Sequence, residues 1–184
     1  MTNFKKMIYA ALFAALVFVS TTVIKISTPT MGYIHPGDGL VLLSGLFLGP
    51  LWGGLAAGFG SMLSDLIGGY LTYVPATFLI KCGTAAIASF LYREYTELSG
   101  KKRSTVGVVL AGALSEAFMV LGYFVYEIFL LGIATGGGLS SASINAGITA
   151  SAAGIPFNIV QGIFGVIIAV VLYPILRKID ALHQ

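Results

Sequence analysis

Long apolar runs recur along the whole chain, separated by short stretches rich in Gly, Pro or basic residues. An apolar run of about 20 residues is long enough to cross a bilayer as a helix. The pattern predicts six segments, at about 7–26, 38–49, 52–69, 75–92, 106–132 and 153–176. A Gly-Pro pair in "GPLWGG" separates the short second segment from the third. These two therefore form either a tight antiparallel pair or one half-span followed by one full span.

The composition indicates that these helices belong to a membrane protein. The 184-residue chain is 57% hydrophobic and only 9% charged, whereas a soluble domain carries about 25% charged residues. We therefore expect an all-α integral membrane protein, folded as one compact six-transmembrane-helix bundle over residues 1–184. No G-x-x-x-x-G-K-[ST] motif occurs, so ATP hydrolysis through a P-loop is excluded.

The basic residues predict the orientation of the bundle. Eight of the ten Lys and Arg residues lie before the first segment, between the fourth and fifth, or after the sixth: Lys5, Lys6, Arg93, Lys101, Lys102, Arg103, Arg177 and Lys178. With six spans these three places face one side, which the positive-inside rule makes cytoplasmic. Both termini are then cytoplasmic. The net charge of +3 reflects this topology, and we expect no nucleic-acid partner.

Three connections then face the outside: 27–37, 70–74 and 133–152. The first and the last are long for a compact bundle, and long loops are often lids or binding loops. Tyr33 and His35 lie on the first, where a lid role and a plain surface role are both open. The Gly-, Ser- and Ala-rich stretch 133–152 is either a lid or a plain connector.

Lys81 and Lys25 do not follow the charge rule. Lys81 stands alone in the apolar run "YVPATFLIKCGTAAIASFLY". A lysine inside a span costs about 2.5–3.5 kcal/mol by insertion scales, so it needs a partner or a function. Asp65 and Glu127 are candidate partners. Asp38 follows "HPG" and is a candidate N-cap or a ligand contact.

Polar residues in the outer halves of the segments predict a shared pocket. Glu116, Tyr123 and Glu127 are seven and four residues apart and share one stripe of a helix. Asn158 and Gln161 share a face of the last segment. With Lys81 these groups form the composition of a binding pocket, apolar walls with a few placed polar groups. Interhelical ion pairs and hydrogen bonds are the structural alternative. No metal or cofactor site is predicted.

Four alanines in "AALFAA" form a second pattern, with Ala10 and Ala14, and Ala11 and Ala15, four residues apart. Small residues at this spacing let another helix approach closely. The partner is either a helix of the same bundle or another subunit.

The runs "GYIHPGDGLVLLSGLFLGPLWGGLAAGFGSMLSDLIGGYLTYVPATFLIKCGTAAIASFLY", "GYFVYEIFL" and "GIPFNIVQGIFGVII" resemble the substrate-binding S components of energy-coupling factor (ECF) transporters. The likeness is greatest to the riboflavin-type branch associated with hydroxymethylpyrimidine or vitamin B6 precursors. It implies a prokaryotic plasma-membrane protein that binds a vitamin outside and works with a transmembrane coupling subunit and two cytoplasmic ATPases.

The resemblance also implies roles for the residues above. The alanine pattern of the first segment would meet the coupling subunit. The pocket would comprise Lys81, Glu116, Tyr123, Glu127, Asn158 and Gln161, with Tyr33 and His35 on the lid. Hydroxymethylpyrimidine and pyridoxine-like compounds are the expected substrates, and riboflavin and pantothenate remain open.

Two other functions are weighed against this one. A stand-alone proton-coupled carrier would use Asp65, Lys81 and Glu116 as a relay, although no inverted repeat supports it. An intramembrane enzyme is disfavoured, because H-E-x-x-H, G-x-S-x-G and a Cys–His pairing are all missing. No catalytic residue is predicted.

Overall fold

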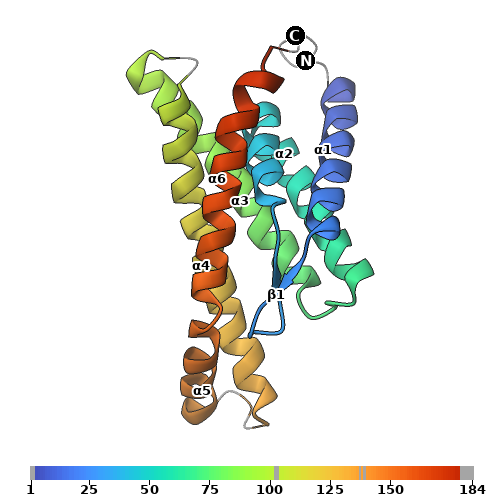
Figure 1. Cartoon of the computed structure of the whole chain (residues 1–184), viewed down its shortest axis with the longest axis vertical. Coiled ribbons are helices and arrows are strands. Elements are labelled where there is room, and N and C mark those ends of the chain that lie inside the picture. The colour runs from blue at the N-terminus through green and yellow to red at the C-terminus, as the bar shows by residue number, and fades with distance from the viewer. Residues whose placement is uncertain (1–2, 102–103, 137, 139, 179–184) are drawn as a thin grey trace.

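A computed structural model describes residues 3–101, 104–136, 138 and 140–178 of the chain. The elements in chain order are α1 (Asn3–Val23), β1 (Ile26–Ser27), β2 (Tyr33–Ile34), α2 (Asp38–Gly68), α3 (Val74–Ser99), α4 (Thr105–Ala134), α5 (Ser141–Ala152) and α6 (Ile155–Leu176). The predicted all-α class is confirmed, and among the described residues a single pair of two-residue strands accompanies the helices (Figure 1). Within these ranges, every helix except α5 is long and apolar enough to cross a membrane.

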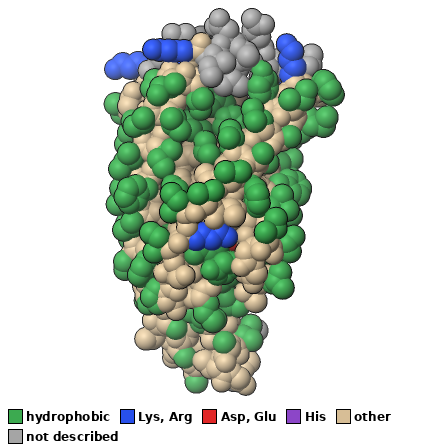
Figure 2. Space-filling model, turned by 45° about the vertical axis from the view of Figure 1, so that its right-hand side comes forward, with side chains coloured by type: hydrophobic (Ala, Val, Ile, Leu, Met, Phe, Trp, Pro, Cys, Tyr) green, Lys and Arg blue, Asp and Glu red, His purple; other side chains and the backbone are tan. Residues whose placement is uncertain are grey.

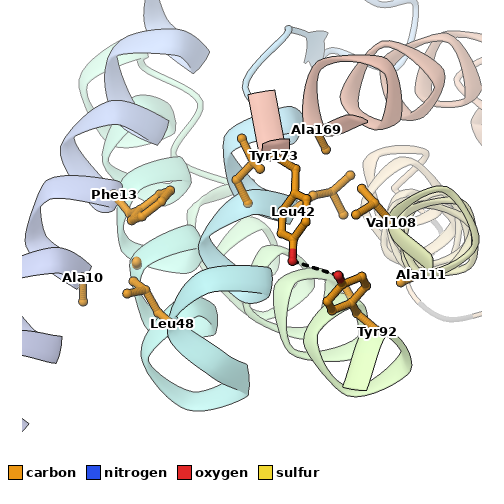
Figure 3. Close-up of a cluster of buried hydrophobic side chains, with 12 residues drawn as sticks. Ala10, Phe13, Leu42, Leu48, Tyr92, Val108, Ala111, Ala169 and Tyr173 are labelled. Atoms are coloured by element: carbon orange, nitrogen blue, oxygen red, sulfur yellow. Dashed lines mark hydrogen bonds between the residues drawn. The ribbon is translucent and has the colours of Figure 1, made fainter. Parts of the chain in front are cut away.

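The helices pack around α2 and α4. Helix α2 contacts α1, α3 and α6, and α4 contacts α3, α5 and α6. One core cluster joins α1, α2, α3, α4 and α6 (Figure 3). Leu42 lies in this cluster, and the Tyr173 hydroxyl donates to the Tyr92 hydroxyl across it at 2.8 Å. This hydrogen bond satisfies two buried hydroxyl groups in an otherwise apolar environment.

Helix α2 reverses direction at Gly49 and Pro50. Gly49 has φ 85° and ψ 176°, outside the helical region, a conformation that glycine adopts without a steric penalty. The Ser44 hydroxyl donates to the Gly53 carbonyl at 3.0 Å, whereas nine residues of straight helix would separate them by about 13 Å. The predicted second and third segments are therefore the tight antiparallel pair.

The arm of α2 that precedes Gly49 is too short to span a bilayer. It begins partway along the long axis of the molecule and runs to the end where α1 begins (Figure 1). Asp38, its first residue, therefore lies inside the bundle and is fully buried. Since this arm is no full span, the six-span count stays a prediction, and five spans are supported by length and apolarity.

The stretch 133–152 is mostly helical, so its prediction as an outer loop was wrong. Helix α4 continues to Ala134, and Ser141–Ala152 form α5. Ser140 caps α5 by accepting a hydrogen bond from the Ser143 backbone N–H at 3.2 Å. A Cβ atom at Gly147 would lie 2.1 Å from the Ile128 carbonyl oxygen. The small residues that suggested a loop instead allow α5 to pack closely on α4.

The four alanines of α1 face two different environments. Ala10 is buried against α2, and Ala14 is half-buried, with its carbonyl oxygen 2.5 Å from where a Cβ of Gly60 would lie. Ala11 and Ala15 are exposed. The first pair therefore packs inside this bundle, and only the second pair is free to meet another subunit.

The predicted basic places share one end of the molecule. The first turn of α1, the end of α3, the start of α4 and the last turn of α6 lie at that end (Figure 1), and Lys and Arg side chains gather there (Figure 2). Lys102 and Arg103 lie outside the described residues. This arrangement agrees with the positive-inside pattern. That the end is cytoplasmic stays a prediction.

Close backbone contact between α2 and α3 generates a stability prediction. A Cβ atom at Gly45 would lie 2.1 Å from the Ala85 carbonyl oxygen, so Gly45→Ala should force the two backbones apart. We expect a loss of about 1–3 kcal/mol of stability, typical of overpacking, seen as a lower melting temperature in detergent. Gly122→Ala is the matched control, because a Cβ there meets only the Ile80 side chain at 3.1 Å. Equal melting temperatures for both variants would contradict the prediction.

Candidate functional site

A hairpin between α1 and α2 covers one side of a polar cavity. Ile26 pairs with Ile34, and Ser27 pairs with Tyr33, in antiparallel register. At the tip of this hairpin, Met31 has φ 63°, a backbone conformation that non-glycine residues adopt rarely. We call residues 26–35 the hairpin lid. It lies toward the end of the molecule opposite the start of α1 (Figure 1).

The cavity beneath the hairpin lid is small and polar. Its volume is about 30 Å³, enough for one or two water molecules. Its walls come from the hairpin lid and from α1, α2, α3, α4 and α6. The lining residues are Thr21, Thr28, Gly32, Tyr33, His35, Asp65, Tyr73, Thr77, Tyr123, Glu127, Asn158 and Gln161.

Two carboxylates hold the hairpin lid against the helices. The Tyr33 hydroxyl donates to Asp65 Oδ1 at 2.6 Å. The Thr30 hydroxyl donates to Glu127 Oε1 at 2.8 Å, and the Tyr73 hydroxyl donates to the Thr30 carbonyl at 2.6 Å. Tyr73 Oη also lies 3.2 Å from Glu127 Oε1. Opening the hairpin lid therefore breaks bonds to charged acceptors, which are stronger than bonds between neutral groups.

A chain of hydrogen bonds and one ion pair forms the floor of the cavity. The His35 backbone N–H donates to Gln161 Oε1 at 3.0 Å, and Gln161 Nε2 donates to Asp38 Oδ2 at 2.7 Å. Lys81 Nζ lies 2.6 and 2.8 Å from the two Asp38 oxygens. Both ends of the Gln161 amide are therefore occupied, which determines its orientation.

Lys81 pairs with Asp38 and not with either of the candidate partners, Asp65 and Glu127. Both partners are fully buried. Asp38 does not cap α2 either, because Gly37 occupies the N-cap position and no side chain caps that end. The carboxylate instead lies in the first turn, where the helix dipole favours negative charge. Lys81 therefore lies beneath the cavity instead of lining it, with Nζ 5.3 Å from the centre of the Tyr123 ring.

Glu116 is also absent from the cavity lining. Its side chain is buried next to Gly162 and Gly165 of α6, and neither carboxyl oxygen has a hydrogen-bond partner among the described residues. It borders an apolar groove between α4 and α6. The remaining six predicted pocket residues line the cavity together: Tyr33, His35, Tyr123, Glu127, Asn158 and Gln161.

The structure adds lining residues that sequence reasoning did not select: Thr21, Thr28, Gly32, Asp65, Tyr73 and Thr77. Asp65 had a sequence signal, since it is a carboxylate inside an apolar segment, but it was considered as a partner of Lys81 or as part of a proton relay and was not assigned to the ligand contacts. Thr77 lies one helical turn before Lys81 and accepts a hydrogen bond from Tyr123 at 3.1 Å. Threonine is common in membrane helices, so its position alone carries no signal.

Burial affects the titratable groups of the hairpin lid. It lowers the pKa of His35 to about 3, so this imidazole is neutral at physiological pH. His35 Nδ1 accepts the Gly37 N–H at 3.1 Å, which leaves the proton on Nε2. Burial, and then the neighbouring Asp65, raise the pKa of Tyr33. Within the described ranges, no group of three or more His, Cys, Asp and Glu side chains could hold a metal ion.

The ion pair generates a prediction that separates pairing from ligand contact. Lys81→Met leaves the buried Asp38 carboxylate uncompensated, and we expect it to destabilise the ligand-free protein by about 3–5 kcal/mol. The double variant Lys81→Met with Asp38→Asn removes both charges and should recover most of that loss. Thermal unfolding in detergent, without any vitamin, measures both. A double variant no more stable than the single one would contradict the pairing.

Comparisons with known proteins agree with this architecture. The profile of the family described as "ECF-type riboflavin transporter, S component" matches residues 1–178. An uncharacterized protein in the gap 3′ region of Pyrococcus woesei is 34% identical over 163 residues, 88% of this chain and 95% of that protein. The fold is similar to a structure reported under "Structure and mechanism of the S component of a bacterial ECF transporter", with a TM-score of 0.69, 22% identity and coverage of 96% of this chain and 98% of that chain. Because the family profile spans nearly the whole sequence, this chain belongs to the S components of ECF-type riboflavin transporters, the non-catalytic subunits of membrane vitamin transporters.

Proposed function

We propose that this S component captures a small vitamin or vitamin precursor at the outer face of the plasma membrane of a prokaryotic cell. The observation that carries the proposal is the polar and aromatic cavity beneath the hairpin lid, at the end away from the gathered basic residues. A hydroxymethylpyrimidine or pyridoxine-like heterocycle fits this proposal better than a large flavin, because the closed cavity of about 30 Å³ would have to enlarge less to hold it.

The hairpin lid must open for any vitamin to enter. Ligand pockets usually have volumes of about 300–1,000 Å³, whereas the closed cavity has about 30 Å³. Rotation of the hairpin lid would release Tyr33 from Asp65 and Thr30 from Glu127. The ligand then replaces these bonds, stacks on Tyr123 and takes hydrogen bonds from Asn158 and Gln161. Lys81 orients Gln161 through Asp38 without touching the ligand.

Delivery to the cytoplasm depends on other subunits in this proposal. The sequence has no P-loop, so a coupling subunit and two ATPases supply the energy. The exposed alanines Ala11 and Ala15 form the contact with the coupling subunit. Small side chains on a membrane helix permit the close approach that such a contact needs.

A binding titration of the purified chain, in detergent and without partners, tests the proposed function. We expect tight binding of one compound from a panel of hydroxymethylpyrimidine, pyridoxine, riboflavin and pantothenate. Asn158→Leu removes a cavity amide and should weaken that binding about tenfold or more. Asn145→Leu is the matched control, because Asn145 is exposed on α5. The proposal is rejected if no compound binds. If the two variants change the affinity equally, the binding site does not lie in this cavity.

An uptake assay in cells that contain the coupling subunit and ATPases tests the partner surface. Ala15→Trp adds bulk to the exposed face of α1, so we expect vitamin binding to persist and uptake to stop. Val171→Trp, on an exposed position of α6, should allow uptake. Uptake that persists in Ala15→Trp would reject the docking role. Uptake by the purified chain alone, without ATP, would favour the proton-coupled carrier instead.

A further inference from the structure

We infer, on the basis of the proposed function, that the cavity selects a heterocycle bearing a positive charge or an amino group over its neutral or acidic counterparts. Three features of the cavity support this preference, which the family assignment does not address: carboxylate oxygens without hydrogen-bond partners among the described residues, lysines whose ammonium groups contact other residues, and a wall of aromatic rings.

The first feature is a pair of incompletely bonded carboxylates. Asp65 and Glu127 both line the cavity, and their side chains are 4% and 3% exposed. Glu127 accepts hydrogen bonds through Oε1 only, whereas Asp65 accepts from Tyr33 through Oδ1 and has the Thr77 hydroxyl as a further polar neighbour. Among the described residues, Asp65 Oδ2 and Glu127 Oε2 have no hydrogen-bond partner. A buried acceptor without a partner is costly, so a ligand that donates hydrogen bonds would relieve both.

The second feature is the position of the nearest lysines. Over the described parts of the chain, no Lys or Arg lines the cavity. Lys81 donates to both oxygens of Asp38. Lys25 lies with Nζ 4.2 Å from the centre of the Tyr33 ring and donates to the Ser64 carbonyl. Both lysines reduce the negative potential near Asp65, but neither offers a hydrogen bond to a cavity ligand.

The imidazole in the wall does not change this charge balance. His35 is buried and neutral, and only its Nε2–H remains free to donate, because Nδ1 accepts the Gly37 N–H. The lining therefore contains two carboxylates and no cationic side chain. A ligand carboxylate would meet these acids as a like charge, which is unfavourable in a site shielded from water.

The third feature is aromatic. Tyr33, Tyr73 and Tyr123 line the cavity, and the Tyr73 and Tyr123 ring centres lie 6.5 Å apart. Aromatic faces attract cations, more strongly where water is excluded. The tyrosine rings and the two carboxylates together thus favour a flat cation or an amine that donates several hydrogen bonds. The same lining offers an acidic ligand few favourable contacts to offset the loss of its hydration.

Three vitamin B6 compounds test the inference, because they differ at one ring substituent. Pyridoxamine carries an ammonium group there, pyridoxine a hydroxymethyl group, and 4-pyridoxic acid a carboxylate. We expect pyridoxamine to bind roughly tenfold more tightly than pyridoxine, the gain typical of one charge-assisted hydrogen bond, and 4-pyridoxic acid to bind most weakly. A second pair, 4-amino-5-hydroxymethyl-2-methylpyrimidine and its 4-hydroxy counterpart, should show the same preference for the amine.

Variants that replace each cavity carboxylate by a carboxamide test whether these acids cause the preference for amines. Asp65→Asn and Glu127→Gln should each bring the ratio of amine to neutral affinity closer to one. Glu97→Gln is the control, since it neutralises an exposed acid near the end of α3 that does not line the cavity, and it should keep the wild-type ratio. A variant that fails to fold is recognised by its melting profile, and the wild-type ligand series then decides the question alone.

The possible results separate this inference from the proposed function. If no compound binds, including riboflavin and pantothenate, both the proposed function and the charge preference are rejected. If the wild type binds riboflavin, pyridoxine or the acid more tightly than every amine, the function stands and the charge preference is wrong. A preference for the amines that Asp65→Asn and Glu127→Gln leave intact also overturns the assignment to these two carboxylates.

Discussion

The buried pair of Lys81 and Asp38 is the interaction on which the rest of this structure depends. An unpaired charge inside the bilayer would cost several kcal/mol, so the bundle must place a carboxylate within reach of the lysine. The short first arm of α2 does this by starting inside the bundle instead of at its surface. Gly49 and Pro50 then return the chain, so that the second arm can pass the same level again.

The ion pair also connects the bundle to the cavity. Asp38 accepts from Gln161 as well as from Lys81, and Gln161 accepts from the backbone of His35. Helices α2, α3 and α6 and the hairpin lid therefore meet in one hydrogen-bonded chain. Buried polar groups are costly when they lack hydrogen-bond partners. This series of hydrogen bonds therefore favours a single arrangement of the cavity floor. In the wall opposite, Asp65 and Glu127 each keep one oxygen without a hydrogen-bond partner among the described residues.

The apolar pattern was sufficient to predict the long helices and half of the cavity lining, because the face of a helix follows from residue spacing and the depth follows from position within a segment. It was insufficient wherever two packings suit the same residues. The small residues of 133–152 are typical of a loop, but the close packing of α5 on α4 requires the same small residues. The four alanines of α1 occupy adjacent faces, and spacing alone does not say which pair meets α2. Asp38 was considered as an N-cap or a ligand contact and not as the partner of Lys81, because nothing in its segment reveals that the helix begins inside the bundle.

The order of Asp38 and Lys81 along the chain has a consequence for biogenesis. Asp38 precedes Lys81 by 43 residues, and the two arms of α2 lie between them. During synthesis the acid is therefore already within the growing protein when the lysine-bearing helix leaves the ribosome. Helix α3 can then enter the lipid against a neighbour that carries its counter-ion. The half-length arm thus provides each newly made molecule with the acceptor that its most expensive residue needs during insertion.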